Sequence, residues 1–185
     1  MIPDLGTSHS GRDVAGVRAE PVAEPPRHQT SRAAMLIATF FGAGRLHPGP
    51  GTWGSAAALF LWAAIAYQLP PALRTPVVIA LTALVTLVGI PAATRVARDT
   101  GGKDPQFVVI DEVAGQLIAL IAVPLTWKSF LAGFILFRAF DIVKPPPVRQ
   151  LEALPEGYGI VLDDVMAGIY AFAVMHLLLA FGALK

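Results

Sequence analysis

The stretch FVVIDEVAGQLIALIAV at residues 107–123 is apolar along most of its length and is interrupted near its start by two adjacent acids, Asp111 and Glu112. It does not alternate apolar with polar residues, so the pattern favours a helix over a strand. Pro124 follows directly, at a position where a helix is expected to stop. The stretch therefore predicts a buried or membrane-embedded helix that carries carboxylates near its beginning.

Four more runs of this kind lie on either side. Alanine and leucine dominate them, and they occupy residues 55–69, 76–93, 129–143 and 165–184. A shorter apolar helix is expected at residues 33–41, followed by a loop rich in glycine and proline at residues 42–54. The predicted fold is all-α: a multihelical membrane-embedded bundle with about five long hydrophobic helices.

Composition and length favour a membrane location. Hydrophobic residues make up 55% of the chain and charged residues 15%, whereas soluble domains carry about 25% charged residues. The runs have about 15 to 20 residues each, close to the length that spans a bilayer. The alternative is a compact bundle that buries these helices in water.

The basic residues favour the same location. If the runs cross a membrane in turn, with the N-terminus inside, eleven of the 14 lysines and arginines fall on the cytoplasmic side. Such an asymmetry is typical of inner-membrane proteins. We therefore expect the chain in a bacterial inner (cytoplasmic) membrane.

The N-terminal segment differs in composition from the apolar runs. Residues 1–32 are rich in proline and charge without apolar periodicity, which predicts a disordered tail before a helical domain at residues 33–185. A docking arm is the alternative for this tail.

The formal net charge of +1 argues against a nucleic-acid partner. The absence of cysteine excludes thiolate metal sites and cysteine nucleophiles. The sequence does not predict an oligomeric state.

Five acids are expected at one level of this bundle, on the cytoplasmic side. Two open the third run, one closes the fourth and two open the fifth: Asp111, Glu112, Asp141, Asp163 and Asp164. Such a cluster needs a cation to neutralise its charge, and Mg²⁺ prefers oxygen ligands of this kind. Helix capping is the alternative. Capping does not explain Asp141 near a helix end, although Arg138 could pair with it.

Other residues at this level could bind an anion. Lys103 and Lys144 flank the predicted helices, and Gly51-Thr52 leads into the first long one, where backbone N–H groups bind phosphate well. Alternatively, the two lysines are interfacial anchors and the Gly51-Thr52 segment is an ordinary turn. His47 shares the loop and could also reach a phosphate. Gly115 and Gly168 follow the acidic pairs and would either let two helices approach closely or serve as ordinary packing positions.

Four segments together resemble the phosphatidylglycerophosphatase A family. They are LHPGPGTWGS (46–55), KDPQFVVIDEVAGQ (103–116), FRAFDIVKPPP (137–147) and GYGIVLDDVMAGIYA (157–171), in the same order as in the family. The resemblance covers about residues 34–183. It implies an all-helical Mg²⁺-dependent lipid phosphatase of the inner membrane, with its active site facing the cytoplasm. Its substrate would be phosphatidylglycerophosphate, which loses its terminal phosphate to give phosphatidylglycerol.

The resemblance also implies roles for individual residues. The metal-binding and catalytic positions would be Asp111, Glu112, Asp141, Asp163 and Asp164, and the substrate phosphate would contact Gly51, Thr52, Lys103, Arg138 and Lys144. We favour direct attack by water, because no DxDx(T/V) stretch is present, but an acyl-phosphate route stays open. The alternative functions are a small ion or proton transporter that uses the clustered acids and a structural membrane subunit.

Overall fold

The computed structural model describes residues 31–184, and within them the chain forms helices and no strand. This confirms the all-α prediction. The elements are α1 (Arg32–Ala38), η1 (Ala43–Arg45), α2 (Pro50–Gln68), α3 (Pro71–Thr100), α4 (Ile110–Ala119), α5 (Trp127–Val143), α6 (Val148–Leu151) and α7 (Glu156–Ala180). The predicted tail lies outside the described residues except for its last two positions, and Arg32 already belongs to α1.

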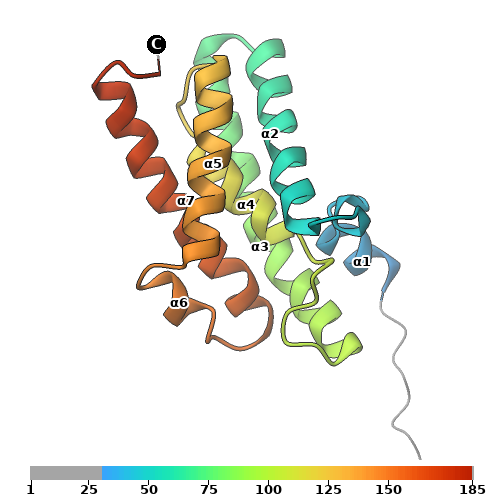
Figure 1. The fold of residues 1–185 in the computed structure, drawn as a ribbon. Helices are drawn as coiled ribbons and strands as arrows, with labels where there is room; N and C mark the ends of the chain where they lie inside the picture. Colours follow the sequence, from blue (N-terminus) through green and yellow to red (C-terminus); the bar gives the residue numbers. More distant parts are fainter. Residues whose placement is uncertain (1–30, 185) are drawn as a thin grey trace, which may run out of the picture.

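Four long helices, α2, α3, α5 and α7, run along the length of the molecule, and the shorter α4 lies in the middle (Figure 1). α4 contacts all four of them. Its apolar side chains Val113, Ala114 and Leu117 are fully buried. The decisive acidic stretch is thus the central helix of the bundle, and the other helices cover it.

Within residues 31–184, two helices are long and apolar enough to cross a membrane: α3, with 30 residues, and α7, with 25. The prediction of about five such helices is wrong, although each predicted run is helical. α4 has 10 residues because the chain turns at residues 120–122, and α5 has 17. α2 begins with the weakly apolar sequence PGTWGS. The cytoplasmic orientation, which assumed five crossings, stays a prediction.

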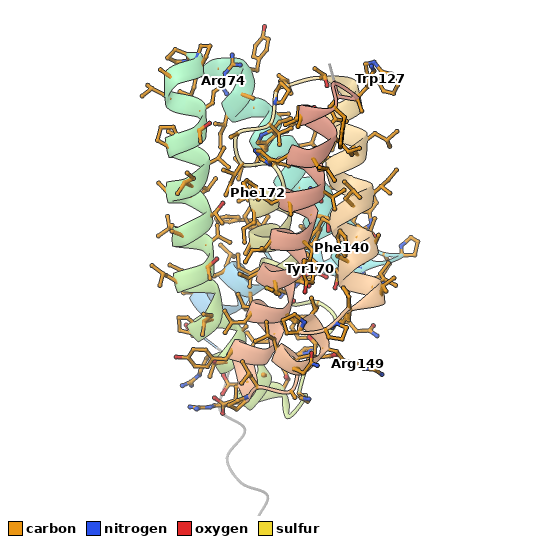
Figure 2. The ribbon with its side chains drawn as sticks, turned by 90° about the vertical axis from the view of Figure 1, so that its left-hand side faces the viewer. Arg74, Trp127, Phe140, Arg149, Tyr170 and Phe172 are labelled. Carbon is orange, nitrogen blue, oxygen red and sulfur yellow. The ribbon has the colours of Figure 1, made fainter. Side chains whose placement is uncertain are left out.

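The outer surface of the bundle is nevertheless strongly apolar. Side chains project outward along the long helices (Figure 2), and the large exposed ones include Leu84, Leu87, Leu131, Ile135 and Leu177. Arg74 and Trp127 lie at one end of the molecule and Arg149 at the other (Figure 2). Apolar surface of this extent marks contact with lipid or with another protein.

Glycines set the distance between α4 and α7. A Cβ atom on Gly168 would collide with the carbonyl oxygen of Gly115, and one on Gly115 would lie 2.5 Å from the carbonyl oxygen of Asp164. The two helices therefore touch through their backbones, as the close-approach interpretation of these glycines predicts. Asp111 and Asp164 each lie four residues, about one turn, before one of these glycines. The contact consequently holds the two carboxylates close to each other.

Candidate active site

A cavity of about 460 Å³ opens where the starts of α2 and α4 meet the end of α5 and the third turn of α7. All the predicted site residues except Lys103 line it: Gly51, Thr52, Asp111, Glu112, Arg138, Asp141, Lys144, Asp163 and Asp164. Lys103 lines a smaller adjoining pocket of about 40 Å³, which shares Asp104 and Asp163 with the cavity. The structure thus brings together side chains that are up to 113 positions apart in the sequence, from Gly51 to Asp164.

Three of the five acids form a compact group. Carboxylate oxygens of Asp111, Glu112 and Asp164 all lie within 4.8 Å of one another. Asp111 is 8% exposed and Asp164 3%. Oδ1 of Asp111 and Oε2 of Glu112 are buried without a hydrogen-bond partner. Buried carboxylates in this state are costly, and a hard cation with oxygen ligands would satisfy them. The residues present therefore fit a divalent cation such as Mg²⁺.

The other two acids hold basic side chains at the cavity wall. Arg138 Nη1 donates a hydrogen bond to Oδ2 of Asp141 over 2.6 Å and lies 3.8 Å from Oε1 of Glu112. Lys144 Nζ donates to Oδ2 of Asp163 over 2.7 Å. Asp141 and Asp163 thus fix two cations beside the three-acid group, in a place where an anionic ligand would contact them.

The position of Asp163 and Asp164 in α7 differs from the prediction that they open the helix. α7 begins at Glu156, so both acids lie in its third turn. Helix capping therefore does not explain them. Asp111 and Glu112 do lie in the first turn of α4, where the helix dipole favours negative charge.

Burial also changes the protonation of the acids on α4. Burial raises the pKa of Asp111 well above its ordinary value, and the charges of Glu112 and Asp164 act in the same direction. Burial raises the pKa of Glu112 to about 7, against the opposing effect of its contact with Asp111. Burial lowers the pKa of Lys144, but the hydrogen bonds and negative charges of Asp163 and Glu152 together outweigh this, and the net effect is a raised pKa. Without a bound cation, Glu112 would therefore be partly protonated at neutral pH.

Two polar residues of the cavity were given no role by the sequence interpretation. Asp104 and Gln106 line the wall between the loop at residues 47–52 and α4. Burial raises the pKa of Asp104 above its ordinary value. The sequence feature that could have identified them is their place beside Lys103 in the segment KDPQF, directly before the acidic helix.

Comparison with known proteins identifies the family. The family model described as Phosphatidylglycerophosphatase A matches residues 36–179. A phosphatidylglycerophosphatase A of Haemophilus influenzae is 43% identical over 142 residues, which cover 76% of this chain and 85% of the relative. The chain belongs to the phosphatidylglycerophosphatase A family. It is therefore a phosphatase that acts on a phosphate monoester, and the resemblance of its four segments to this family is confirmed.

Two other relatives cover the same region. The phosphatidylglycerophosphatase A of Escherichia coli is 35% identical over 161 residues, 82% of this chain and 91% of the relative. A protein of Bacteroides thetaiotaomicron named putative phosphatidylinositol-3-phosphatase is 42% identical over 144 residues, 76% of this chain and 90% of the relative. Relatives of this family thus carry names that specify different lipid headgroups. No solved structure matches the chain.

Replacement of Gly51 by alanine tests how closely the start of α2 must approach the acids. A Cβ atom at Gly51 would collide with Oε1 of Glu112 and lie 3.2 Å from Nη1 of Arg138. We expect Gly51→Ala to lower the rate of phosphate release by about 10- to 100-fold, because both side chains must move. Stability should change by less than about 1 kcal/mol, because alanine favours the helix.

Steady-state phosphate release and thermal unfolding of the purified variant measure these two effects. Gly102→Ala is the matched control, because a Cβ atom there meets its nearest neighbour at an ordinary 3.6 Å. Equal activity in the two variants would show that the site does not need the close approach of α2.

Proposed function

We propose that the protein hydrolyses the terminal phosphate monoester of phosphatidylglycerophosphate, giving phosphatidylglycerol and phosphate, with Mg²⁺ as cofactor. The relatives from H. influenzae and E. coli carry this activity in their names. The observation that carries the proposal is a single cavity lined by three converging carboxylates and by two fixed basic side chains, Arg138 and Lys144. We further propose that the enzyme lies in the inner membrane with this cavity on the cytoplasmic side.

Arg138 and Lys144 are the proposed contacts for the phosphoryl oxygens. Both carry positive charge at the cavity wall, and charge-assisted hydrogen bonds to phosphate are among the stronger ones. In the first turn of α2, the N–H groups of Thr52 and Trp53 both donate to the carbonyl oxygen of Gly49. The N–H of Gly51 and the hydroxyl of Thr52 are therefore the donors that this turn offers to a phosphate.

Asp111, Glu112 and Asp164 are the proposed metal ligands. Mg²⁺ bound there would supply positive charge beside the phosphoryl oxygens and lower the pKa of a water molecule. Among the described acids of the cavity, Asp104 alone lies outside both the three-acid group and the pairs with Arg138 and Lys144. We assign Asp104 as the acceptor of the proton from the attacking water, a role that its raised pKa suits.

Hydrolysis of phosphatidylinositol 3-phosphate is the second candidate function, because the B. thetaiotaomicron relative is nearly as similar as that from H. influenzae. The three acids and two cations would serve either phosphate monoester. Ion transport, the alternative from sequence, requires access to the acids from both sides of a membrane, and the family assignment favours the phosphatase.

The decisive assay measures phosphate release by the detergent-purified protein. Phosphatidylglycerophosphate and phosphatidylinositol 3-phosphate are supplied in mixed micelles, each with Mg²⁺ or with EDTA. We expect Mg²⁺-dependent release, with a kcat/KM at least about tenfold higher for phosphatidylglycerophosphate. Absence of Mg²⁺-dependent release from this lipid, or a preference for the inositol lipid, would contradict the proposed function.

The raised pKa of Glu112 predicts an unusual pH dependence for the metal-free protein. Its ordinary value is 4.5 and its value in the fold is about 7, so in this interval the folded state holds a proton that the unfolded chain has released. Its contribution to stability is complete below about pH 4.5 and is lost as the pH rises through about 7. Asp111 acts in the same direction. Mg²⁺ competes with these protons, so stabilisation by Mg²⁺ should grow with pH.

Thermal unfolding at pH 5.5 and pH 8, in EDTA and in Mg²⁺, measures this dependence. The protein in EDTA should unfold at a lower temperature at pH 8, and Mg²⁺ should restore most of the difference. Glu112→Gln should reduce the pH dependence. Higher stability in EDTA at pH 8 than at pH 5.5 would show that these acids are not protonated in the fold.

A further inference from the structure

Two further hollows along α1 and η1 adjoin the acidic cavity. A hollow of about 430 Å³ shares His47, Pro50 and Gln106 with the acidic cavity. A second hollow, of about 350 Å³, shares Met35 and Arg45 with the first. Because neighbouring hollows have wall residues in common, the three lie side by side, in order from the acids to the outer face of α1. We call the three together the α1 groove.

The chemistry of the α1 groove changes in order along its length. The three-acid group and the fixed cations lie at one end. Arg45 lies in the middle and has no acidic partner among residues 31–184, in contrast to Arg138. At the far end, Leu36 is 53% exposed and Phe41 is 76% exposed, and a second arginine, Arg32, lines the same hollow. The groove thus offers a phosphate site, then the positive charge of Arg45, then a largely apolar surface that also carries Arg32.

Backbone contacts fix the place of Arg45. Gly42, with φ of 96°, reverses the chain before η1, and the N–H of Arg45 donates to its carbonyl oxygen over 3.0 Å. Gly44 packs so closely on the loop before α4 that a Cβ atom there would collide with the carbonyl oxygen of Phe107. The N–H of Val109 also donates to the carbonyl oxygen of Ala38 over 2.8 Å. The turn that carries Arg45 is therefore attached to the segment that carries the acids.

We propose that the α1 groove binds the body of the lipid substrate, with Arg45 paired to the phosphodiester that joins headgroup to diacylglycerol. The acyl chains then begin at Met35, Leu36 and Phe41, beside the apolar surface of the bundle. The order of groups in the groove matches the order in such a lipid: phosphate monoester, phosphodiester, acyl chain. The inference rests on the proposed lipid-phosphatase function, but either candidate headgroup would satisfy it, because both lipids contain this phosphodiester.

The two reaction products allow the two ends of the groove to be tested separately. Phosphatidylglycerol keeps the phosphodiester and lacks the monoester, whereas inorganic phosphate resembles the monoester alone. In Arg45→Gln we expect the inhibition constant for phosphatidylglycerol, as a mole fraction in mixed micelles, to rise about tenfold. The inhibition constant for phosphate should stay unchanged. KM for phosphatidylglycerophosphate should rise about tenfold and kcat should stay within about twofold.

Arg149→Gln is the matched control, because this exposed arginine of α6 lies outside the groove and its loss changes the net charge equally. It should leave all four constants unchanged. Equal inhibition by phosphatidylglycerol in Arg45→Gln and the wild type would overturn the proposal and would point to another occupant of the groove, such as a second copy of the chain. A similar rise in the inhibition constants of both products would overturn the proposal as well. A wild-type enzyme that releases no phosphate would instead refute the proposed function.

Discussion

Asp164→Asn is expected to lower kcat/KM for phosphate release by at least about 10³-fold while leaving the protein folded. Asp164 is 3% exposed and supplies one of the three convergent carboxylates. The amide keeps the shape of the side chain but removes its charge, and a neutral oxygen is a poorer ligand for a hard cation. Because the change also removes like-charge repulsion from Asp111 and Glu112, the metal-free variant should be at least as stable as the wild type.

Activity assays with Mg²⁺, together with thermal unfolding in EDTA, test this expectation. Asp99→Asn is the control, since this acid pairs with Arg95 on α3 and does not line the cavity. If Asp164→Asn retained a tenth or more of the wild-type activity, the assignment of the three metal ligands would be wrong. If it failed to fold, the carboxylate would have a structural role that this account does not give it.

Gly168→Ala is expected to reduce both stability and activity. The added Cβ atom would collide with the carbonyl oxygen of Gly115, and overpacking of this kind costs about 1–3 kcal/mol. Relief requires α4 and α7 to separate, which moves Asp111 away from Asp164. We therefore expect a lower unfolding temperature and a fall in kcat/KM of about 100-fold, because small displacements in a catalytic site have large effects.

The comparison with two other glycines makes this prediction specific. Gly102→Ala should change neither quantity, and Gly51→Ala should lower activity with little loss of stability. Unchanged stability and activity in Gly168→Ala would mean that the close contact of α4 with α7 does not hold the site together.

The helices were predictable from sequence because apolar runs and prolines are local signals. The start of α7 was less so, since its sequence EGYG contains two glycines that disfavour a helix. Tertiary contacts override this preference: Gly157 packs against the carbonyl oxygen of Ile90, and its N–H donates to Oγ1 of Thr94 over 3.1 Å. The helix consequently begins about two turns before Asp163 and Asp164.

The sequence indicated most of the residues that line the candidate site, but it did not indicate which of them group together. The places of Asp111 and Glu112 at the start of α4 and of Asp141 near the end of α5 predicted the convergence, whereas Asp163 and Asp164 reach the site from the third turn of α7. The grouping of Asp111, Glu112 and Asp164 depends on helix faces and on the contact between Gly115 and Gly168, which no local pattern specifies. Lys103, singled out for its place in the sequence, lines the adjoining pocket instead.

Titration calorimetry of Mg²⁺ into the metal-free protein at pH 8 measures cation binding by the three acids without any substrate. We predict saturable binding to the wild type, the same binding to Asp99→Asn, and at least about tenfold weaker binding to Asp111→Asn and Asp164→Asn. Absence of saturable binding to the folded wild type, or equal binding to all four proteins, would contradict the claim that these carboxylates converge to hold a divalent cation.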